Sequence, residues 1–341
     1  MSKNKIKLGI FFGGISPEHE VSLSSAEGII NNVDRSKFKV IEIYIDIKGQ
    51  FWIGNSVLEK INAKKKNQLK KLDVNTLSKL IDVAFPVLHG EGGEDGSIQG
   101  FFETLKIPYV GCDVSSSVVC LDKVYFNQIM HVNKIKQSRF EVIDFKYENT
   151  EVIKEKILFI KNNFKMPLFV KSSRTGSSVG VYKVTKPSLL VSAINKSKKF
   201  DSKIVIEEGV NNAKEVEVSV LGNSSKDIKV SLPGLVVPGA EFYDYDDKYH
   251  NNLAKFEIPV NLPKNKIEEI QDVAIKAYKL TNCGGLARVD FLLDKNLNIY
   301  INEINTLPGF TPVSMYPKLW EVTGLSYSKL ITKLILLAYK K

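Results

Sequence analysis

The sequence contains little cysteine, little arginine and no long hydrophobic run. Only three cysteines occur among 341 residues, and their spacing fits neither a metal site nor a disulfide framework. This usage indicates a reducing compartment, so we expect a cytoplasmic protein whose three thiols are small buried side chains. No apolar segment is long enough to span a membrane, and the short apolar stretch near the N-terminus lacks the features of a signal peptide. We therefore expect no membrane partner.

Basic residues outnumber acidic residues, and the formal net charge is +10. The densest basic cluster, at 63–71, contains no aromatic side chain for base stacking, and the other lysines are scattered. We therefore expect no nucleic-acid partner, and we interpret the charge as a solvated surface that also suits anionic small molecules. Only four of the 48 basic residues are arginine. Two of them, Arg174 and Arg288, fall inside motifs, where the planar five-donor side chain can be required.

The first 111 residues alternate strand, glycine-rich turn and helix, which is the pattern of a parallel sheet. A chain of this length predicts two or three domains. Strands are predicted at 6–12, 40–45 and 81–87, and helices at 22–32, over a lysine-rich stretch to about Leu80, and at 99–105. Ligands of such sheets bind at the carboxyl ends of the strands. The polar turns at 13–22 and 89–97 fall at such ends.

The remaining chain predicts two further domains, at 112–206 and 207–341, after a first domain at 1–111. The middle region is expected to hold a helix at 115–133, strands at 168–172 and 179–184, and a helix at 187–198. The third region is expected to open with a strand at 204–207, followed by a strand-rich stretch at 215–238, a long polar loop at 239–257 and a helix at 263–282. The loop is long enough to be functional. A hairpin of two strands then completes the region.

The hairpin carries polar side chains on one face. Arg288 and Asp290 share a face of its first strand, and Glu303 and Asn305 share a face of its second. Either plausible register puts Asp290 on the face of Glu303 and Asn305. Two carboxylates and an amide oxygen are ligands for a hard cation, Mg²⁺ or Mn²⁺. A structural salt bridge from Arg288 to one carboxylate is the alternative, but it leaves the other carboxylate and Asn305 unexplained.

Features that could bind phosphate accompany this metal site. Phosphate oxygens would complete the coordination shell of the metal. Lys171 ends an apolar strand and precedes the loop GSSVG at 176–180, whose backbone N–H groups can bind anions. Lys123 follows Asp122 early in a helix, and Glu207 ends a strand whose following residues could contact a purine. Together these features suggest a nucleotide between two β-rich layers, with metal ions at its phosphates.

Eight motifs occur in an order and at a spacing typical of one family. They are GGISPEHEVS at 13–22, HGEGGEDGSIQG at 89–100, Asp-Lys at 122–123, VKSSRTGSSVG at 170–180, IEEGV at 206–210, EFYDYDDKY at 241–249, ARVDF at 287–291 and NEINTLPGFTPVSMYP at 302–317. Through them nearly the whole chain resembles the D-alanine–D-alanine ligases of the ATP-grasp superfamily. The resemblance implies a three-domain ATP-grasp fold. Its N-terminal domain would be a Rossmann-like parallel sheet of the α/β class, and its ATP-grasp part would be α+β.

The resemblance also implies a reaction. ATP would phosphorylate the carboxylate of a first D-alanine, and the amine of a second D-alanine would attack the D-alanyl phosphate to form a dipeptide for peptidoglycan synthesis. Two Mg²⁺ or Mn²⁺ ions per site would be held by Asp290, Glu303 and Asn305. We also expect a homodimer.

By this resemblance Glu18 would bind the ammonium group of the first D-alanine, and Ser177 and Tyr249 would hydrogen-bond with it. Arg288 and the N–H of Gly309 would form the oxyanion hole. A helix-capping role is the structural alternative for Glu18.

The other implied contacts concern the second substrate and the nucleotide. His89 lies in a turn near the first substrate, where a hydrogen-bonded turn residue is the structural alternative, and Ser314 and Met315 would receive the second carboxylate. The implied nucleotide contacts are Lys123, Lys171 and Lys248 at the phosphates, Glu207, Glu208 and Val210 at the adenine, and Glu215 at the ribose.

Three alternative functions differ in chemistry. A D-alanine–D-lactate ligase is the nearest, and Tyr249 favours dipeptide synthesis because relatives of that type lack the tyrosine-bearing loop. A non-catalytic ATP-binding protein would be expected to lack a metal ligand or the oxyanion arginine, and this sequence has both. A nucleic-acid-binding protein is the third, and the scatter of the lysines argues against it.

Overall fold

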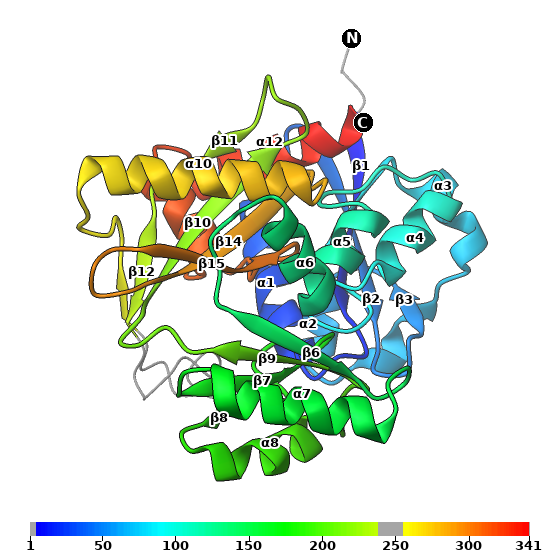
Figure 1. Ribbon diagram of the computed structural model, residues 1–341. Coiled ribbons are helices and arrows are strands. Elements are labelled where there is room, and N and C mark those ends of the chain that lie inside the picture. The colour runs from blue at the N-terminus through cyan, green and yellow to red at the C-terminus, as the bar shows by residue number, and fades with distance from the viewer. Residues whose placement is uncertain (1–4, 238–254, 341) are drawn as a thin grey trace.

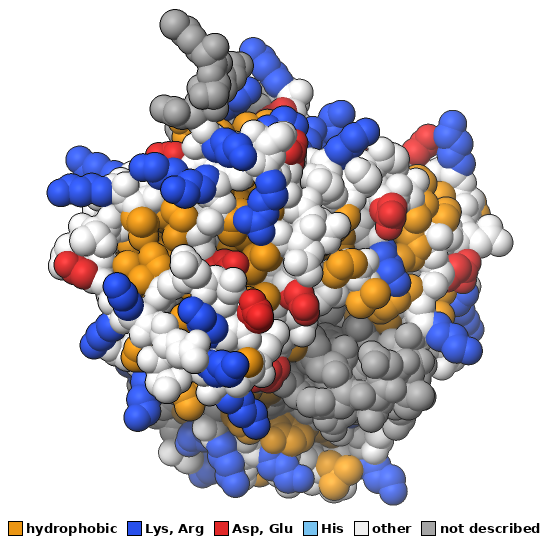
Figure 2. Space-filling view, turned by 180° about the vertical axis from the view of Figure 1, so that it is seen from behind, with side chains coloured by type: hydrophobic (Ala, Val, Ile, Leu, Met, Phe, Trp, Pro, Cys, Tyr) orange, Lys and Arg blue, Asp and Glu red, His pale blue; other side chains and the backbone are white. Residues whose placement is uncertain are grey.

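The described residues form three β-sheets with helices packed on them (Figure 1). The computed structural model describes residues 5–237 and 255–340. Lys248 and Tyr249 lie outside the described residues, as does most of the loop expected at 239–257. No helix in the described ranges combines the length and the apolar character that crossing a membrane requires. On the face seen in Figure 2, the described Lys and Arg side chains are spread out among polar and acidic ones.

The first sheet has the strand order β4-β3-β2-β1-β5. Its parallel centre consists of β1 (Ile6–Gly13), β2 (Phe38–Ile45) and β5 (Val83–Pro86). The helical stretch expected up to Leu80 is wrong in part. It contains the antiparallel strands β3 (Phe51–Ile53) and β4 (Lys70–Lys71) and short helical turns, namely α2 (Val57–Asn62), η1 (Lys66–Gln68), η2 (Val74–Thr76) and α3 (Leu77–Leu80).

A tight turn explains the extra strands. Asp46 accepts hydrogen bonds from the N–H groups of Lys48 and Gln50, and its carboxylate also accepts one from the Trp52 indole. This turn folds β3 back onto β2. Such pairing overrides the weak helix preference of the lysines that follow.

Helices from both ends of the chain cover this sheet. On one face, α1 (His19–Asn32) packs with the C-terminal helix α12 (Tyr327–Tyr339), and Leu334 and Ile335 join the core of Leu8 and Ile10. On the other face, α4 (Ser97–Thr104) contributes Phe102 to a second core. The C-terminal end of the chain therefore contributes to the core of the first sheet.

The second sheet is antiparallel, with the order β6-β9-β7-β8. Its strands are β6 (Phe140–Asp144), β9 (Lys203–Glu208), β7 (Leu168–Ser172) and β8 (Tyr182–Val184), and it packs against α7 (Thr150–Asn163), η3 (Pro187–Leu189) and α8 (Leu190–Ser197). The strand expected to open the third region is β9, which pairs here with β6 and β7. The expected helix at 115–133 is two helices, α5 (Val114–Leu121) and α6 (Lys123–Val132), because Asp122 has extended backbone angles and caps α6.

The third sheet has the order β13-β12-β10-β14-β15, with β11 beside β10. Its strands are β10 (Lys214–Gly222), β11 (Lys229–Val230), β12 (Gly234–Val237), β13 (Lys255–Glu257), β14 (Gly285–Leu293) and β15 (Ile299–Asn305), accompanied by α10 (Lys264–Leu280) and α11 (Met315–Val322). The hairpin of β14 and β15 pairs Asp290 with Glu303 and Arg288 with Asn305. This register resolves the alternatives that the sequence left open.

Candidate active site

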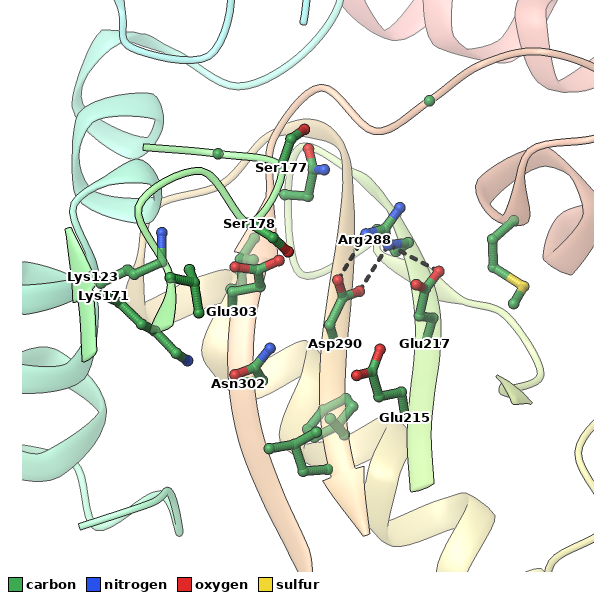
Figure 3. Close-up of a pocket in the computed structure, with 18 of the residues that line it drawn as sticks. Lys123, Lys171, Ser177, Ser178, Glu215, Glu217, Arg288, Asp290, Asn302 and Glu303 are labelled. Atoms are coloured by element: carbon green, nitrogen blue, oxygen red, sulfur yellow. Dashed lines mark hydrogen bonds and ion pairs between the residues drawn. The ribbon is translucent and has the colours of Figure 1, made fainter. Parts of the chain in front are cut away.

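A cavity of about 1410 Å³ is lined by residues of the second and third sheets, by the turns that follow β1 and β5 of the first sheet, and by the start of α1. Every residue that the sequence analysis assigned to a site, and that the structure describes, lines this one cavity. They are Glu18, His89, Lys123, Lys171, Ser177, Glu207, Glu208, Val210, Glu215, Arg288, Asp290, Glu303, Asn305, Gly309, Ser314 and Met315. In Figure 3 the labelled side chains of β10, β14 and β15 lie on one side of the cavity, and Lys123 and Lys171 lie on the other.

Arg288 lies at the centre of a charged cluster on the third sheet (Figure 3). It donates two hydrogen bonds to Asp290, of 2.8 and 2.7 Å, and its Nε lies 3.0 Å from Glu217 Oε2. Burial alone would lower the pKa of Arg288, but the two carboxylates raise it well above its ordinary value. The guanidinium is therefore a fixed positive charge facing the cavity.

Glu217 is a member of this cluster that the sequence analysis missed. It is buried and pairs with Asp290 across β10 and β14. The available signal was the alternation in KEVEVSV, which puts Glu217 on the same face of β10 as Glu215. Only the pairing of β10 with β14, 71 residues apart at this point, brings Glu217 to Arg288.

The oxygen donors on the hairpin fit a hard cation. Asp290 and Glu303 lie opposite each other on adjacent strands, and Asn305 follows two positions later on β15. Carboxylate and amide oxygens are the donors that Mg²⁺ and Mn²⁺ prefer. Among the described residues, no cluster of three His, Cys, Asp or Glu could hold a metal alone. A metal at this hairpin would therefore need the Asn305 oxygen and oxygens of a bound ligand.

The salt bridge that the sequence analysis kept as an alternative is present. Arg288 holds both oxygens of Asp290. Glu303 lies on the side of the hairpin nearer the lysines. The Asn305 Oδ1 accepts a hydrogen bond from the N–H of Leu307, at 3.2 Å.

Two lysines face the hairpin from the other side of the cavity. Lys171 donates to Glu207 Oε2 at 2.6 Å, and Lys123 donates to the carbonyl oxygen of Thr175 at 2.7 Å. Burial and the neighbouring Lys171 lower the pKa of Lys123. Burial also acts to lower the pKa of Lys171, but the Glu207 carboxylate outweighs it and raises that pKa. The arrangement offers two amines to an anion.

The start of the loop after β7 is anchored by two sets of contacts. Asp122 caps α6 and accepts hydrogen bonds from Ser173 Oγ at 2.6 Å and Lys203 Nζ at 2.7 Å. Arg174 donates to both oxygens of Asp201, at 2.9 and 2.8 Å. Arg174 is therefore a structural residue in the loop, whereas Arg288 faces the cavity.

Glu18 meets the loop after β7 across the cavity. Ser177 Oγ donates to Glu18 Oε1 at 2.7 Å, and the two residues are 159 positions apart. Glu18 occupies the N-cap position of α1, but its side chain makes no capping hydrogen bond. The contact with Ser177 is therefore favoured over the helix-capping alternative.

Gly90 lies against the Glu18 carboxylate. Its φ is +66°, and a Cβ atom there would lie 2.8 Å from Glu18 Oε2 and 2.7 Å from Ser16 Oγ. Neither the backbone angle nor the space suits another residue. Gly90, the first glycine in HGEGGEDG, is thus required by the close approach of Glu18.

His89 and Glu94, from the same motif, lie side by side. The His89 Nδ1 donates to the carbonyl oxygen of Leu307 at 3.1 Å and lies 4.0 Å from a Glu94 carboxylate oxygen. Burial lowers the pKa of His89, although the charge of Glu18 opposes this. Burial and the charge of Glu18 raise the pKa of Glu94 to about 8. The sequence analysis did not select Glu94, although it is an acid inside a recognised motif.

The loop after β15 brings Gly309 and Ser314 together. A Cβ atom at Gly309 would lie 3.2 Å from Ser314 Oγ. Ser314 Oγ accepts a hydrogen bond from the N–H of Thr311 at 3.1 Å and lies 2.8 Å from Thr311 Oγ1. Met315 is buried and packs with Leu319 and Val236. Met315 therefore belongs to the core as well as to the cavity lining.

The residues expected at the nucleotide base also line the cavity. Glu208 accepts a hydrogen bond from the N–H of Lys165 at 3.1 Å and lies 3.7 Å from Arg139, so its side chain is partnered within the protein. Asn127 donates to Glu207 at 3.0 Å. Since both carboxylates are partnered by protein groups, their contact with a base would use the backbone.

The chain matches two family models. Residues 7–112 match the model described as D-ala D-ala ligase N-terminus, and residues 129–336 match the D-ala D-ala ligase C-terminus. A D-alanine–D-alanine ligase from Caldicellulosiruptor bescii is 43% identical over 99% of this chain and 96% of its own length. D-alanine–D-alanine ligase B from Clostridium tetani is 44% identical over 98% of this chain and 94% of its own length.

Solved structures share the fold. The VanG D-Ala:D-Ser ligase from Enterococcus faecalis has a TM-score of 0.87 at 33% identity, covering 98% of this chain and 100% of that one. The D-alanine–D-alanine ligase from Coxiella burnetii has a TM-score of 0.82 at 30% identity, covering 99% and 95%. The ATP-grasp fold expected from the motifs is thereby confirmed. This chain belongs to the D-alanine–D-alanine ligase family.

Proposed function

We propose that the protein uses ATP to join two molecules of D-alanine through a D-alanyl phosphate intermediate, supplying a dipeptide for peptidoglycan precursors. Family membership over nearly the whole chain supports the ligase activity. One observation carries the chemistry. A single cavity collects an acid for an ammonium group (Glu18), amines for phosphates (Lys123 and Lys171) and oxygen donors for a metal (Asp290 and Glu303).

In the first step, the carboxylate of the first D-alanine attacks the γ-phosphorus of ATP, the bond from that phosphorus to the bridging oxygen breaks, and ADP leaves. Glu18 binds the ammonium group of this D-alanine, and Ser177 fixes the Glu18 carboxylate. Lys123 and Lys171 bind ATP phosphates, so the step depends on positioning and on charge neutralisation. Asp290, Glu303 and Asn305 would hold two Mg²⁺ or Mn²⁺ ions, which would neutralise phosphate charge.

In the second step, the neutral amine of the second D-alanine attacks the acyl carbon, and the C–O bond to phosphate breaks. Arg288 and the N–H of Gly309 stabilise the oxyanion of the tetrahedral intermediate. Ser314 and Met315 receive the second carboxylate, and His89 lies beside the first substrate. The nucleotide base contacts Glu207, Glu208 and Val210, and Glu215 binds the ribose. We assign Lys248 to the γ-phosphate and Tyr249 to the contact with Ser177 and Glu18.

The organisation of the protein follows the same proposal. We propose a first-substrate domain at 1–111, a central domain at 112–206 and a C-terminal domain with the metal site at 207–341. The boundary between the second and third domains falls inside β9. The last two residues of β9 would therefore belong to the third domain, although β9 pairs within the second sheet. We further propose that the protein is cytoplasmic, because the three cysteines are free and buried. The homodimer is proposed from the family resemblance alone.

The test is a phosphate-release assay with ATP, Mg²⁺ and a panel of D- and L-amino acids. We expect release with D-alanine alone and none with L-alanine. D-Serine and D-lactate, each in competition with D-alanine across pH, test the second site. Depsipeptide as the main product at neutral pH would replace the proposed function with that of a D-alanine–D-lactate ligase.

A further inference from the structure

A buried chain of hydrogen bonds joins α1, the turn after β5 and the loop after β15. The Phe310 N–H donates to Ser25 Oγ at 3.4 Å, and Ser25 Oγ lies 3.3 Å from His89 Nε2. His89 Nδ1 contacts the carbonyl oxygen of Leu307 at 3.1 Å. A carbonyl oxygen can only accept, so Nδ1 carries the proton and Nε2 accepts from the Ser25 hydroxyl. Ser25 and His89 are both buried.

These hydrogen bonds hold the backbone on both sides of Gly309. The Gly309 N–H belongs to the peptide unit between Pro308 and Gly309. The unit before it is held through the Leu307 carbonyl oxygen, and the unit after it is held through the Phe310 N–H. No described residue accepts a hydrogen bond from the Gly309 N–H itself. The donor is therefore left free while its neighbours are fixed.

The rest of the loop is docked independently of Ser25. The Phe310 carbonyl oxygen accepts a hydrogen bond from Tyr327 Oη at 2.6 Å, and the Phe310 ring packs edge-on against Phe85 at 5.7 Å. Phe310 is also buried. Loss of the Ser25 hydroxyl would therefore leave the loop in place while releasing the orientation of its peptide units.

We propose that Ser25 and His89 are positioning residues that aim the Gly309 N–H at the developing oxyanion, an inference that rests on the proposed function. Ser25 touches neither substrate nor nucleotide in this assignment and acts through the backbone of the loop. An oxyanion donor must lie within a few tenths of an ångström of its ideal position, and a displacement of about 1 Å can cost about 10²-fold in rate.

The test compares Ser25→Ala with Ser231→Ala. Ser231 is also a buried serine whose hydroxyl makes two hydrogen bonds, to the N–H of Ser219 and the carbonyl oxygen of Leu232, and it does not line the cavity. Dipeptide synthesis reports the second chemical step. Positional isotope exchange in ¹⁸O-labelled ATP, with D-alanine present, reports the reversible first step.

We expect Ser25→Ala to lower kcat for dipeptide synthesis about 10-fold, with the isotope exchange rate and the KM for ATP within about 2-fold of wild type. Ser231→Ala should leave kcat within about 2-fold. His89→Asn keeps a donor for the Leu307 oxygen, so its kcat should exceed that of His89→Leu.

Two results would overturn the positioning role. The first is dipeptide synthesis at the wild-type rate in Ser25→Ala, and the second is an equal loss of exchange and synthesis, which would indicate general damage to the cavity. Failure of the proposed function is distinguishable, because wild-type protein would then make no dipeptide at all.

Discussion

The two sides of the cavity are built from different kinds of contact. On the hairpin side, Arg288, Asp290, Glu217 and Glu303 lie on adjacent strands of one sheet and are fixed by its register. On the Glu18 side, the carboxylate stands at the start of α1 and meets Ser177 from the loop after β7 and Gly90 from the turn after β5. The hairpin-side residues are therefore pre-organised by the strand pairing of one sheet. The arrangement on the Glu18 side exists only when three separate segments dock.

This difference predicts different failures. Damage to the hairpin side should reduce the rate of the chemical step, because in the proposed function the charges there act on the reacting atoms. Damage to the Glu18 side should weaken binding of the first substrate. Variants on each side, compared by kcat and KM, therefore test whether the two sides have separate roles.

The largest effect is expected on the hairpin side. Arg288→Lys keeps the charge but cannot donate two hydrogen bonds to Asp290 and also reach Glu217. We expect kcat for dipeptide synthesis to fall about 10²-fold or more. Arg35→Lys is the control, because Arg35 is exposed and donates to the Ile30 carbonyl oxygen outside the cavity. Near-wild-type turnover of Arg288→Lys would contradict the oxyanion-stabilising role assigned to Arg288.

The next effect tests the Glu18 side. Gly90→Ala would push a methyl group into the Glu18 carboxylate, and we expect the KM for the first D-alanine to rise about 10-fold. Gly92→Ala is a matched control, since Gly92 also has a positive φ, of +79°, but a Cβ there would meet nothing closer than 3.6 Å. Steady-state kinetics over two ranges of D-alanine concentration measures the KM for the first D-alanine in both variants. Equal effects of the two variants would mean that backbone strain, and not the contact with Glu18, is responsible.

A smaller effect is expected at the other partner of Glu18. Ser177→Ala removes one hydrogen bond to a carboxylate, which corresponds to about a 3- to 10-fold rise in the KM for the first D-alanine. Ser192→Ala, on the exposed side of α8, provides the control. A fall in kcat with KM unchanged would move Ser177 from substrate binding to the chemical step, and the two sides would no longer be distinct.

The smallest effect concerns stability and pH. Because the pKa of Glu94 is raised to about 8, the folded protein takes up a proton that the unfolded chain does not hold between the ordinary glutamate pKa and pH 8. Its contribution to stability is present at low pH and is lost as the pH rises through this window. Glu94→Gln lacks the titration, so its Tm relative to ligand-free wild type should increase from pH 5 to pH 8.5. A constant Tm difference would contradict the raised pKa.

The sequence predicted the hairpin side better than the Glu18 side for a physical reason. Strand alternation puts Glu303 and Asn305 on one face, and a hairpin of adjacent strands adds Asp290 to that face in either plausible register. Glu217 needed the pairing of β10 with β14, which no local pattern specifies. The contact of Ser177 with Glu18 was anticipated only from the family resemblance, because it joins residues 159 positions apart.

Parts of the fold were missed because tertiary contacts decide them. Asp122 interrupts the expected single helix, since its carboxylate caps α6 and also binds Ser173 and Lys203. The segment from β6 to α7 carries no motif, and it was left without a predicted structure. The packing of α12 on the first sheet brings the two ends of the chain together. Sequence patterns of one segment cannot report that arrangement.

The most direct test of the proposed function follows the oxygen atoms of the first substrate. D-Alanine labelled with ¹⁸O in its carboxylate is incubated with the protein, ATP and Mg²⁺, and the dipeptide and phosphate are analysed by mass spectrometry. An acyl phosphate intermediate predicts one D-alanyl-D-alanine and one ADP per phosphate, with one ¹⁸O atom transferred to each phosphate released. Dipeptide without label in the phosphate, or phosphate release without dipeptide, would contradict the account.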